Sequence, residues 1–140
     1  MARNTQKLKE LIYSTLTGDA TLVGLLGDVS KIKHGSPLQK AEYPCVVYGI
    51  IAETDNPYNT DRSAGIARTR LAIQVFSSSD SSTQADQIED QIYTLLHGNQ
   101  LSNSDILMYS AYRVSKTPLF EPDENVWRIE TRYDLVNVGL

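Results

Sequence analysis

Histidine and cysteine are the side chains most often used for catalysis and metal binding near neutral pH, and this chain has few of them. The histidines are His34 and His97, and the single cysteine is Cys45. His34 precedes a Gly-Ser-Pro turn, and His97 ends an expected helix, where an imidazole ring interacts favourably with the helix dipole. Cys45 begins an apolar run without a basic neighbour that would favour its thiolate. We therefore expect no catalytic residue among them, and one cysteine excludes an internal disulfide.

Clustered carboxylates are the other candidates for chemistry. Asp86, Glu89 and Asp90 fall near the start of an expected helix, where acidic side chains complement the helix dipole, so we expect a solvated helix face. The acidic residues of 121–124 lack the ligand spacing of a calcium-binding loop. The chain has no glycine-rich phosphate loop, nucleophile elbow or paired zinc-ligand motif. The sequence therefore predicts no metal site, no cofactor and no enzyme.

Tyrosine and arginine side chains on strands could form a platform for single-stranded nucleic acid. The candidates are Tyr48, Tyr58, Tyr109, Tyr112 and Tyr133, with Arg68 and Arg70. Tyrosine is also favoured in strands and in protein interfaces. The chain has 13 Lys and Arg against 17 Asp and Glu, which gives a net charge of -4. An acidic chain favours a core or interface role for these rings, and we expect no sequence-specific nucleic-acid partner.

Length and composition indicate one folded domain over residues 1–140. The chain has 140 residues, 41% hydrophobic and 21% charged, which is ordinary for a globular domain. No run of 18 apolar residues occurs, so we expect no membrane partner. The N-terminal stretch is amphipathic and does not resemble a secretory signal.

The clearest pattern lies at positions 126–137, where side-chain character alternates as in a half-buried strand. One face is apolar, with Trp127, Ile129, Tyr133 and Leu135, and the other is charged, with Arg128, Glu130, Arg132 and Asp134. The charged face has two interpretations. It is either a solvated surface with weak cross-strand ion pairs or a contact that sets the register between identical subunits.

The other elements follow from apolar spacing and turn formers. We expect helices over 5–16 and from 81–83 to Gly98, a helical turn between Asp19 and Gly27, strands over 31–34, 45–51, 66–77, 105–116 and 126–138, and loops over 54–65 and 117–125. This order predicts an α+β fold: an antiparallel or mixed sheet of about four to five strands with helices packed on one face, and a polar opposite face.

Several of these segments resemble a known family when they are read in order. They are the Gly-Asp and leucine-rich stretch over 16–26, the Tyr-Pro-Cys-Val-Val-Tyr-Gly stretch over 43–49, the strand over 70–77, the helix with Ala85-Asp86-Gln87-Ile88, and the C-terminal strand. Their order and spacing resemble the small tail-completion or tail-terminator proteins of long-tailed, siphovirus-type bacteriophages. The resemblance covers nearly the whole chain.

The resemblance implies a structural virion protein that forms a ring, expected to be a hexamer, on the head-proximal end of the tail tube. Such a ring ends tube polymerisation and offers a surface for head joining. The implied partners are further copies of the chain, the tail tube protein, and a head connector or head-completion protein. The implied location is the virion tail, after assembly in the host cytoplasm. The family has no catalytic residues to transfer.

We expect the interface to involve the charged strand face and the two polar loops, because long loops between well-patterned strands often carry contacts. The candidate interface residues are Arg68, Arg70, Arg128, Glu130, Arg132, Asp134, Tyr58, Arg62, Phe120 and Glu121. One alternative is a head-side connector or a minor tail protein. Another, from a different class, is a small intracellular α+β ligand-binding domain or enzyme.

Overall fold

The computed structural model describes residues 5–35, 43–55, 66–78, 82–122 and 125–139. Its elements, in chain order, are α1 (Thr5–Thr17), α2 (Ala20–Leu26), the 3-10 turn η1 (Val29–Lys31), β1 (Ile32–His34), β2 (Cys45–Asp55), β3 (Ile66–Ser77), α3 (Thr83–Leu96), β4 (Leu101–Ser102), β5 (Ile106–Glu121) and β6 (Val126–Gly139). None of the described helices is long and apolar enough to cross a membrane.

The strands form one mixed sheet of six strands in the order β1-β2-β3-β6-β5-β4. Only β1 and β2 pair in parallel, and the other neighbours are antiparallel. The α+β class is therefore confirmed, but the expected number of four to five strands was too low. The missed strand is β4, which has two residues and is too short to show an alternating pattern.

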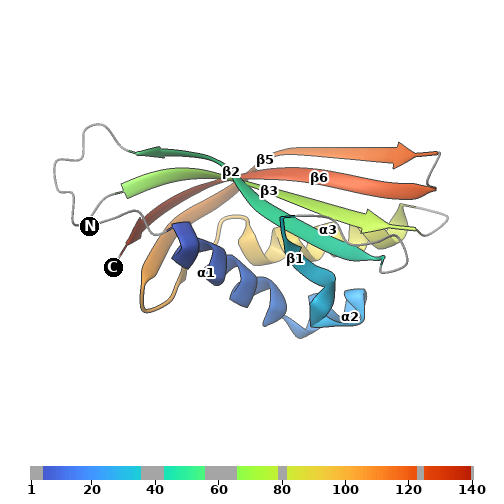
Figure 1. The fold of residues 1–140 in the computed structure, drawn as a ribbon, viewed down its shortest axis with the longest axis horizontal. Coiled ribbons are helices and arrows are strands. Elements are labelled where there is room, and N and C mark those ends of the chain that lie inside the picture. Colours follow the sequence, from blue (N-terminus) through green and yellow to red (C-terminus); the bar gives the residue numbers. More distant parts are fainter. Residues whose placement is uncertain (1–4, 36–42, 56–65, 79–81, 123–124, 140) are drawn as a thin grey trace.

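All three helices cover the same face of the sheet (Figure 1). Their apolar stripes pack against the inner side chains of β3 and β6 to form the main core. Fully buried members include Ile12 and Leu16 of α1, Ile88 and Ile92 of α3, Leu71 and Ile73 of β3, and Ile129, Tyr133 and Leu135 of β6. The alternation predicted for the last strand is thus confirmed on its inner face.

Helix α2 begins and ends where its capping residues predict. Asp19 caps α2, because its carboxylate accepts a hydrogen bond from the Leu22 N–H at 2.9 Å. Gly27 ends α2 with φ of 95°, a left-handed conformation that favours glycine. These caps turn the chain from α1 through α2 into the short strand β1.

The outer face of the sheet is not polar throughout, contrary to the expectation. A second buried cluster contains Cys45, Val47, Phe76 and Val126. These positions alternate with inner-face residues, so they lie on the side away from the helices. Tyr43 stacks on Phe76 with ring centroids 5.5 Å apart and so helps to cover the cluster. Cys45 is buried within it, as the apolar run predicted.

The predicted loop over 117–125 begins too early, because its first residues belong to strand β5. Strand β5 continues to Glu121, and Pro118 pairs with Ile129 inside the ladder. The strand tolerates this proline because β4 pairs only with Leu107 and Met108, which leaves the later part of β5 at an edge where no N–H is needed. The expected loop over 54–65 begins as strand, since β2 runs to Asp55, and positions 56–65 lie outside the described residues.

Candidate interface surfaces

The charged residues predicted on the last strand lie together on the outer face of the sheet. The register of β3 and β6 places Arg70 opposite Asp134. Arg70 donates two hydrogen bonds to the Asp134 carboxylate, at 2.9 and 3.3 Å. These hydrogen bonds and the charge of Asp134 raise the pKa of Arg70 above its usual value. The pair lies at the surface, with about two-fifths of each side chain exposed.

Two further ion pairs continue this face towards the end of the sheet. Arg132 contacts Glu130 at 3.1 Å, and Arg128 contacts Glu121 of β5 at 3.5 Å. Arg68 lies two residues before Arg70 on β3, is exposed and pairs in register with Val136. Exposed pairs of this kind contribute about 0–1 kcal/mol each, so they do little to hold the fold together. We call the outer side chains of Arg68, Arg70, Arg128, Glu130, Arg132 and Asp134 the outer charged face.

Of the remaining interface candidates, Phe120 and Glu121 lie at the end of β5 and not in a loop. Phe120 is 42% exposed and contacts the Trp127 ring, with centroids 4.9 Å apart. Tyr58 and Arg62 lie outside the described residues. The register places Glu121 beside the outer charged face, opposite Val126, whereas Phe120 lies opposite Trp127 on the face that the helices cover.

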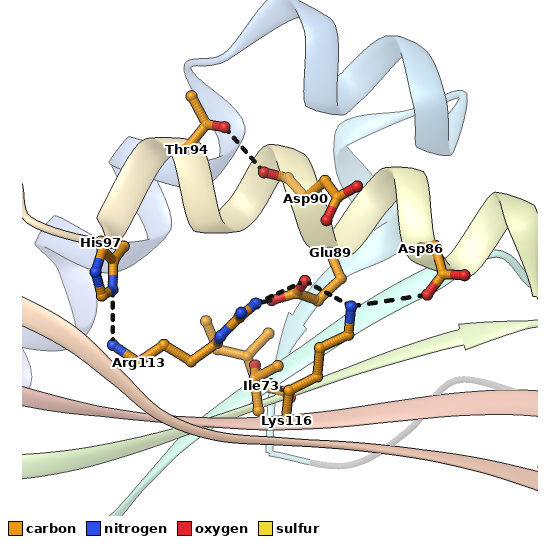
Figure 2. Close-up of polar contacts among 9 residues, drawn as sticks. Ile73, Asp86, Glu89, Asp90, Thr94, His97, Arg113 and Lys116 are labelled. Atoms are coloured by element: carbon orange, nitrogen blue, oxygen red, sulfur yellow. Dashed lines mark hydrogen bonds and ion pairs between the residues drawn. The ribbon is translucent and has the colours of Figure 1, made fainter.

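A buried ionic cluster joins α3 to β5, and Figure 2 shows its members from both elements. Glu89 of α3 is fully buried and accepts hydrogen bonds from the Arg113 guanidinium at 2.9 and 3.0 Å. Lys116 lies 3.5 Å from the Glu89 carboxylate and 3.8 Å from that of Asp86. The expectation that Glu89 belongs to a solvated helix face was therefore wrong. Its burial is possible because two cations from β5 compensate its charge.

The same part of β5 is held at two more points. The Arg113 guanidinium lies over the Tyr93 ring, 4.3 Å from its centroid, and the Arg113 backbone N–H donates to Nδ1 of His97 at 3.0 Å. Burial alone would lower the pKa of Arg113, but the hydrogen bond and the charge of Glu89 raise it on balance. The His97 and Gly98 backbone segment thus covers the edge of β5, since the Gly98 N–H donates to the Ala111 carbonyl at 2.7 Å.

This cluster fixes α3 on β5. Each described charge in it is engaged by a partner of opposite sign, and the described residues contain no group of three or more His, Cys, Asp or Glu that could hold a metal ion. The sequence did contain a signal for the burial of Glu89. It lies four residues after Ala85 and three before Ile92, which places it on the apolar stripe.

Tyr133 lies at the centre of the core beneath this cluster. Burial raises the pKa of its phenol, and the nearby Glu89 charge raises it further. The hydroxyl lies beside the Glu89 carboxylate without meeting the geometry of a hydrogen bond in this structure. The neutral phenol is therefore the form that this core accommodates.

A family model described as "Tail completion protein gp17" matches residues 10–136. This range contains every described helix and strand except the outermost residues of α1 and β6. The chain belongs to the tail completion protein gp17 family. No curated protein sequence matches the chain.

The fold of this tail completion protein also occurs in a solved particle. A chain in a solved virion of a native gene transfer agent particle superposes with a TM-score of 0.75 at 16% sequence identity, over 99% of this chain and 100% of that chain. The fold described above is therefore also found in the virion of a gene transfer agent particle.

Family membership makes this protein a structural component of the phage virion, located in the tail. The predicted resemblance is thereby confirmed at the level of the family. A structural role also agrees with the polar clusters described above, which fasten elements to one another.

One further feature of this tail completion protein was not predicted from the sequence. A depression of about 450 Å3 lies between α1 and the β1–β2 edge of the sheet. Its walls combine rings with polar side chains: Gln6, Lys9, Glu10, Tyr13, His34 and Tyr48. Residues from three segments far apart in the sequence form it, so no local pattern indicates it.

Proposed function

We propose that this protein assembles through copies of itself into a ring, expected to be a hexamer, on the head-proximal end of the tail tube. There it ends polymerisation of the tube protein and presents a surface to a head connector or head-completion protein. Each subunit contributes residues 1–140 as one domain. Membership of the tail completion family over residues 10–136 is the observation that carries this function.

The architecture supports such a role because a subunit of a capping ring needs unlike surfaces. One face of the sheet is covered by helices (Figure 1). The register of β3 and β6 places the outer charged face on the other. The two sheet edges also differ, since β1 borders one side and β4 with the end of β5 borders the other. Unlike sides favour head-to-tail contacts, which close into rings when the rotation between subunits permits.

We propose the outer charged face and the hairpin end with Phe120 and Glu121 as interface surfaces, together with the segment that contains Tyr58 and Arg62. Mixed charges at an interface set orientation and register more than they add affinity. The exposed ion pairs of this face contribute little to folding, which leaves them available for that purpose.

The solution mass of the purified protein over a wide concentration range tests the ring, with negative-stain images of the heaviest species. Closed hexameric rings are the expected result. A protein that stays monomeric both alone and in the presence of tail tube subunits would contradict the ring.

The position of the protein in disrupted particles separates the alternatives. Recovery with tails detached from heads is the expected result, because the ring caps the tube. Recovery with heads alone would instead assign the protein to the head-side connector.

A further inference from the structure

The charges of the outer charged face alternate in sign along β6. Every second side chain of a strand points to the same side, so this face carries in turn Arg128, Glu130, Arg132 and Asp134. Between 25% and 47% of each of these four side chains is exposed. A strand that alternates positive and negative charges can face a second copy of itself that runs in the opposite direction, with opposite charges in contact.

One position of a two-fold axis brings all four charges opposite a partner of the other sign. We place the axis at the level of Thr131, the midpoint of the four residues. Arg128 then faces Asp134 of the second copy, and Glu130 faces Arg132 of the second copy. A shift of the axis by one residue opposes like charges, and a shift by two residues leaves two of the four charges unpaired. A parallel pairing opposes every charge with its own copy.

The same axis brings together exposed apolar side chains of β5. The register places Tyr112 opposite Asp134 and Leu119 opposite Arg128, so the two apolar residues lie at mirrored levels about Thr131. Tyr112 is 54% exposed, and Leu119 is 38% exposed. In the pair, the Tyr112 ring of one copy therefore lies over Leu119 of the other. This burial adds the apolar attraction that exposed ion pairs alone do not supply.

The shape of the outer face follows the same symmetry. Tyr43 stacks on Phe76 with ring centroids 5.5 Å apart, and Phe76 pairs in register with Arg128, so the face is raised at that level. Small residues lie on the outer face at and next to the mirrored level: Gly49, Ala52 and Ala72. A side chain added at Gly49 would meet no atom within 4 Å. The raised rings of one copy therefore meet a low part of the other.

Charge, apolar contact and shape thus point to the same occupant and the same axis. We propose that two copies of this chain pair through their outer faces about this two-fold axis and form a dimer. The pairing goes beyond the proposed ring, because a two-fold contact joins two copies and cannot close a larger ring by itself. The edge strands β1 and β4 keep their outer edges uncovered in the pair, so head-to-tail contacts there remain available.

Two charge reversals in the full chain, Arg128→Glu and Asp134→Arg, test the pairing. By symmetry, each single variant opposes like charges at two points of the dimer, so the dissociation constant should rise roughly tenfold or more. The double variant restores opposite charges at both points and should dimerise nearly like the wild type. Analytical ultracentrifugation over a wide concentration range measures the dissociation constants.

The double variant also separates a contact between copies from an effect within one chain. In the same subunit, Arg128 lies 3.5 Å from Glu121, and Asp134 lies 2.9 Å from Arg70. The double variant turns both of these pairs into like charges. An effect within one chain would therefore make the double variant worse than either single variant, whereas the proposed pairing predicts recovery.

Matched controls carry the same kinds of change on the helices. Lys9→Glu on α1 and Asp90→Arg on α3 change the net charge by the same amounts. Tyr13→Ala on α1 removes a tyrosine that is 44% exposed, as a control for Tyr112→Ala. The three controls should dimerise like the wild type, and Tyr112→Ala should weaken the dimer. Thermal unfolding of every variant separates a folding defect from a lost contact.

The outcomes separate the pairing from the ring. A wild type that stays monomeric until it forms rings on tail tubes would overturn the pairing and leave the ring standing. A double variant that dimerises no better than the single variants, or helix controls that weaken the dimer equally, would also overturn it. Dimers that follow the predicted pattern but never form rings or cap tubes would support the pairing and contradict the ring.

Discussion

Single residues decide how α3 is held on the sheet, and Glu89 is the clearest case. A buried carboxylate is tolerated when hydrogen bonds and opposite charges compensate it, and Arg113 and Lys116 do so here. Replacing a cation of such a group is more damaging than replacing the whole group, because it leaves a buried charge without compensation.

Arg113→Met should therefore lower the free energy of unfolding by about 3 kcal/mol, the lower end for a broken buried pair, because Lys116 still faces Glu89. The double variant Glu89→Leu with Arg113→Met should regain most of that loss. Urea denaturation measures both. The exposed control Asp90→Asn should stay within about 0.5 kcal/mol of the wild type. If Arg113→Met unfolds like that control, the buried pair has no stabilising role.

Tyr48 gives a prediction for alkaline pH. Burial raises its pKa from 10.0 to about 12, and Tyr13 adds to the shift. The folded state therefore keeps the phenol proton that the unfolded state releases. This contribution is complete below pH 10 and is lost as the pH rises through about 12.

The free energy of unfolding of the wild type should thus fall relative to Tyr48→Phe between those pH values, by roughly 2 kcal/mol in total. Denaturation of both proteins at a series of pH values measures the difference. Because both proteins share all other titrating groups, only Tyr48 contributes to it. Parallel pH curves would contradict the burial of this phenol.

At the scale of elements, one residue links two helices. The Asp19 carboxylate caps α2 and also accepts a hydrogen bond from the Gln91 side chain of α3 at 2.8 Å. The cap was predicted from the sequence, but the contact to α3 was not, because the two residues lie far apart in the chain.

Asp19→Ala should lower the free energy of unfolding by about 1–2 kcal/mol, since it removes the N-cap. Asp19→Asn retains a capping oxygen and should lose less than half as much. Thermal or urea unfolding measures both, and Thr21→Ala on the exposed side of α2 is the control. Equal losses for the alanine and asparagine variants would show that the cap is not the main contribution.

The sequence predicted the elements whose pattern is local. The helix stripes and the alternation over 126–137 follow from periodicity, and the α2 cap follows from an aspartate directly before the helix; the structure confirms all three. Strand β4 was missed because its two residues are too few to show an alternating pattern of apolar and polar side chains. The end of β5 was misplaced because Pro118 is usually a breaker, and only its place at a sheet edge makes it acceptable.

Among the candidate surfaces, too, local patterns were predicted and features that depend on the tertiary fold were not. The outer charged face was predicted, because alternation places side chains on one face without any knowledge of strand order. The ionic cluster and the depression beside α1 were not, since each joins segments that only the tertiary fold brings together. Glu89 and Arg113, for example, are 24 residues apart in the chain.

At the scale of the whole molecule, the fold presents two unlike faces and two unlike edges. Helices cover one face of the sheet (Figure 1). The outer charged face occupies the other, and the sheet edges are formed by β1 on one side and by β4 with the end of β5 on the other. The proposed function requires contacts with further copies, a tube and a head component, and these unlike surfaces would give each contact its own place. The membership of the tail completion family and this asymmetry agree with one another.

Tube elongation measures the central claim most directly. Growing tail tubes are mixed with the purified protein, and tube length and tube ends are then followed by electron microscopy. We predict that tubes stop growing, with a ring of density at one end, and that adding fresh tube subunits does not lengthen them. Tubes that continue to lengthen at both ends, with the folded protein present in excess and absent from the tube ends, would contradict a capping role.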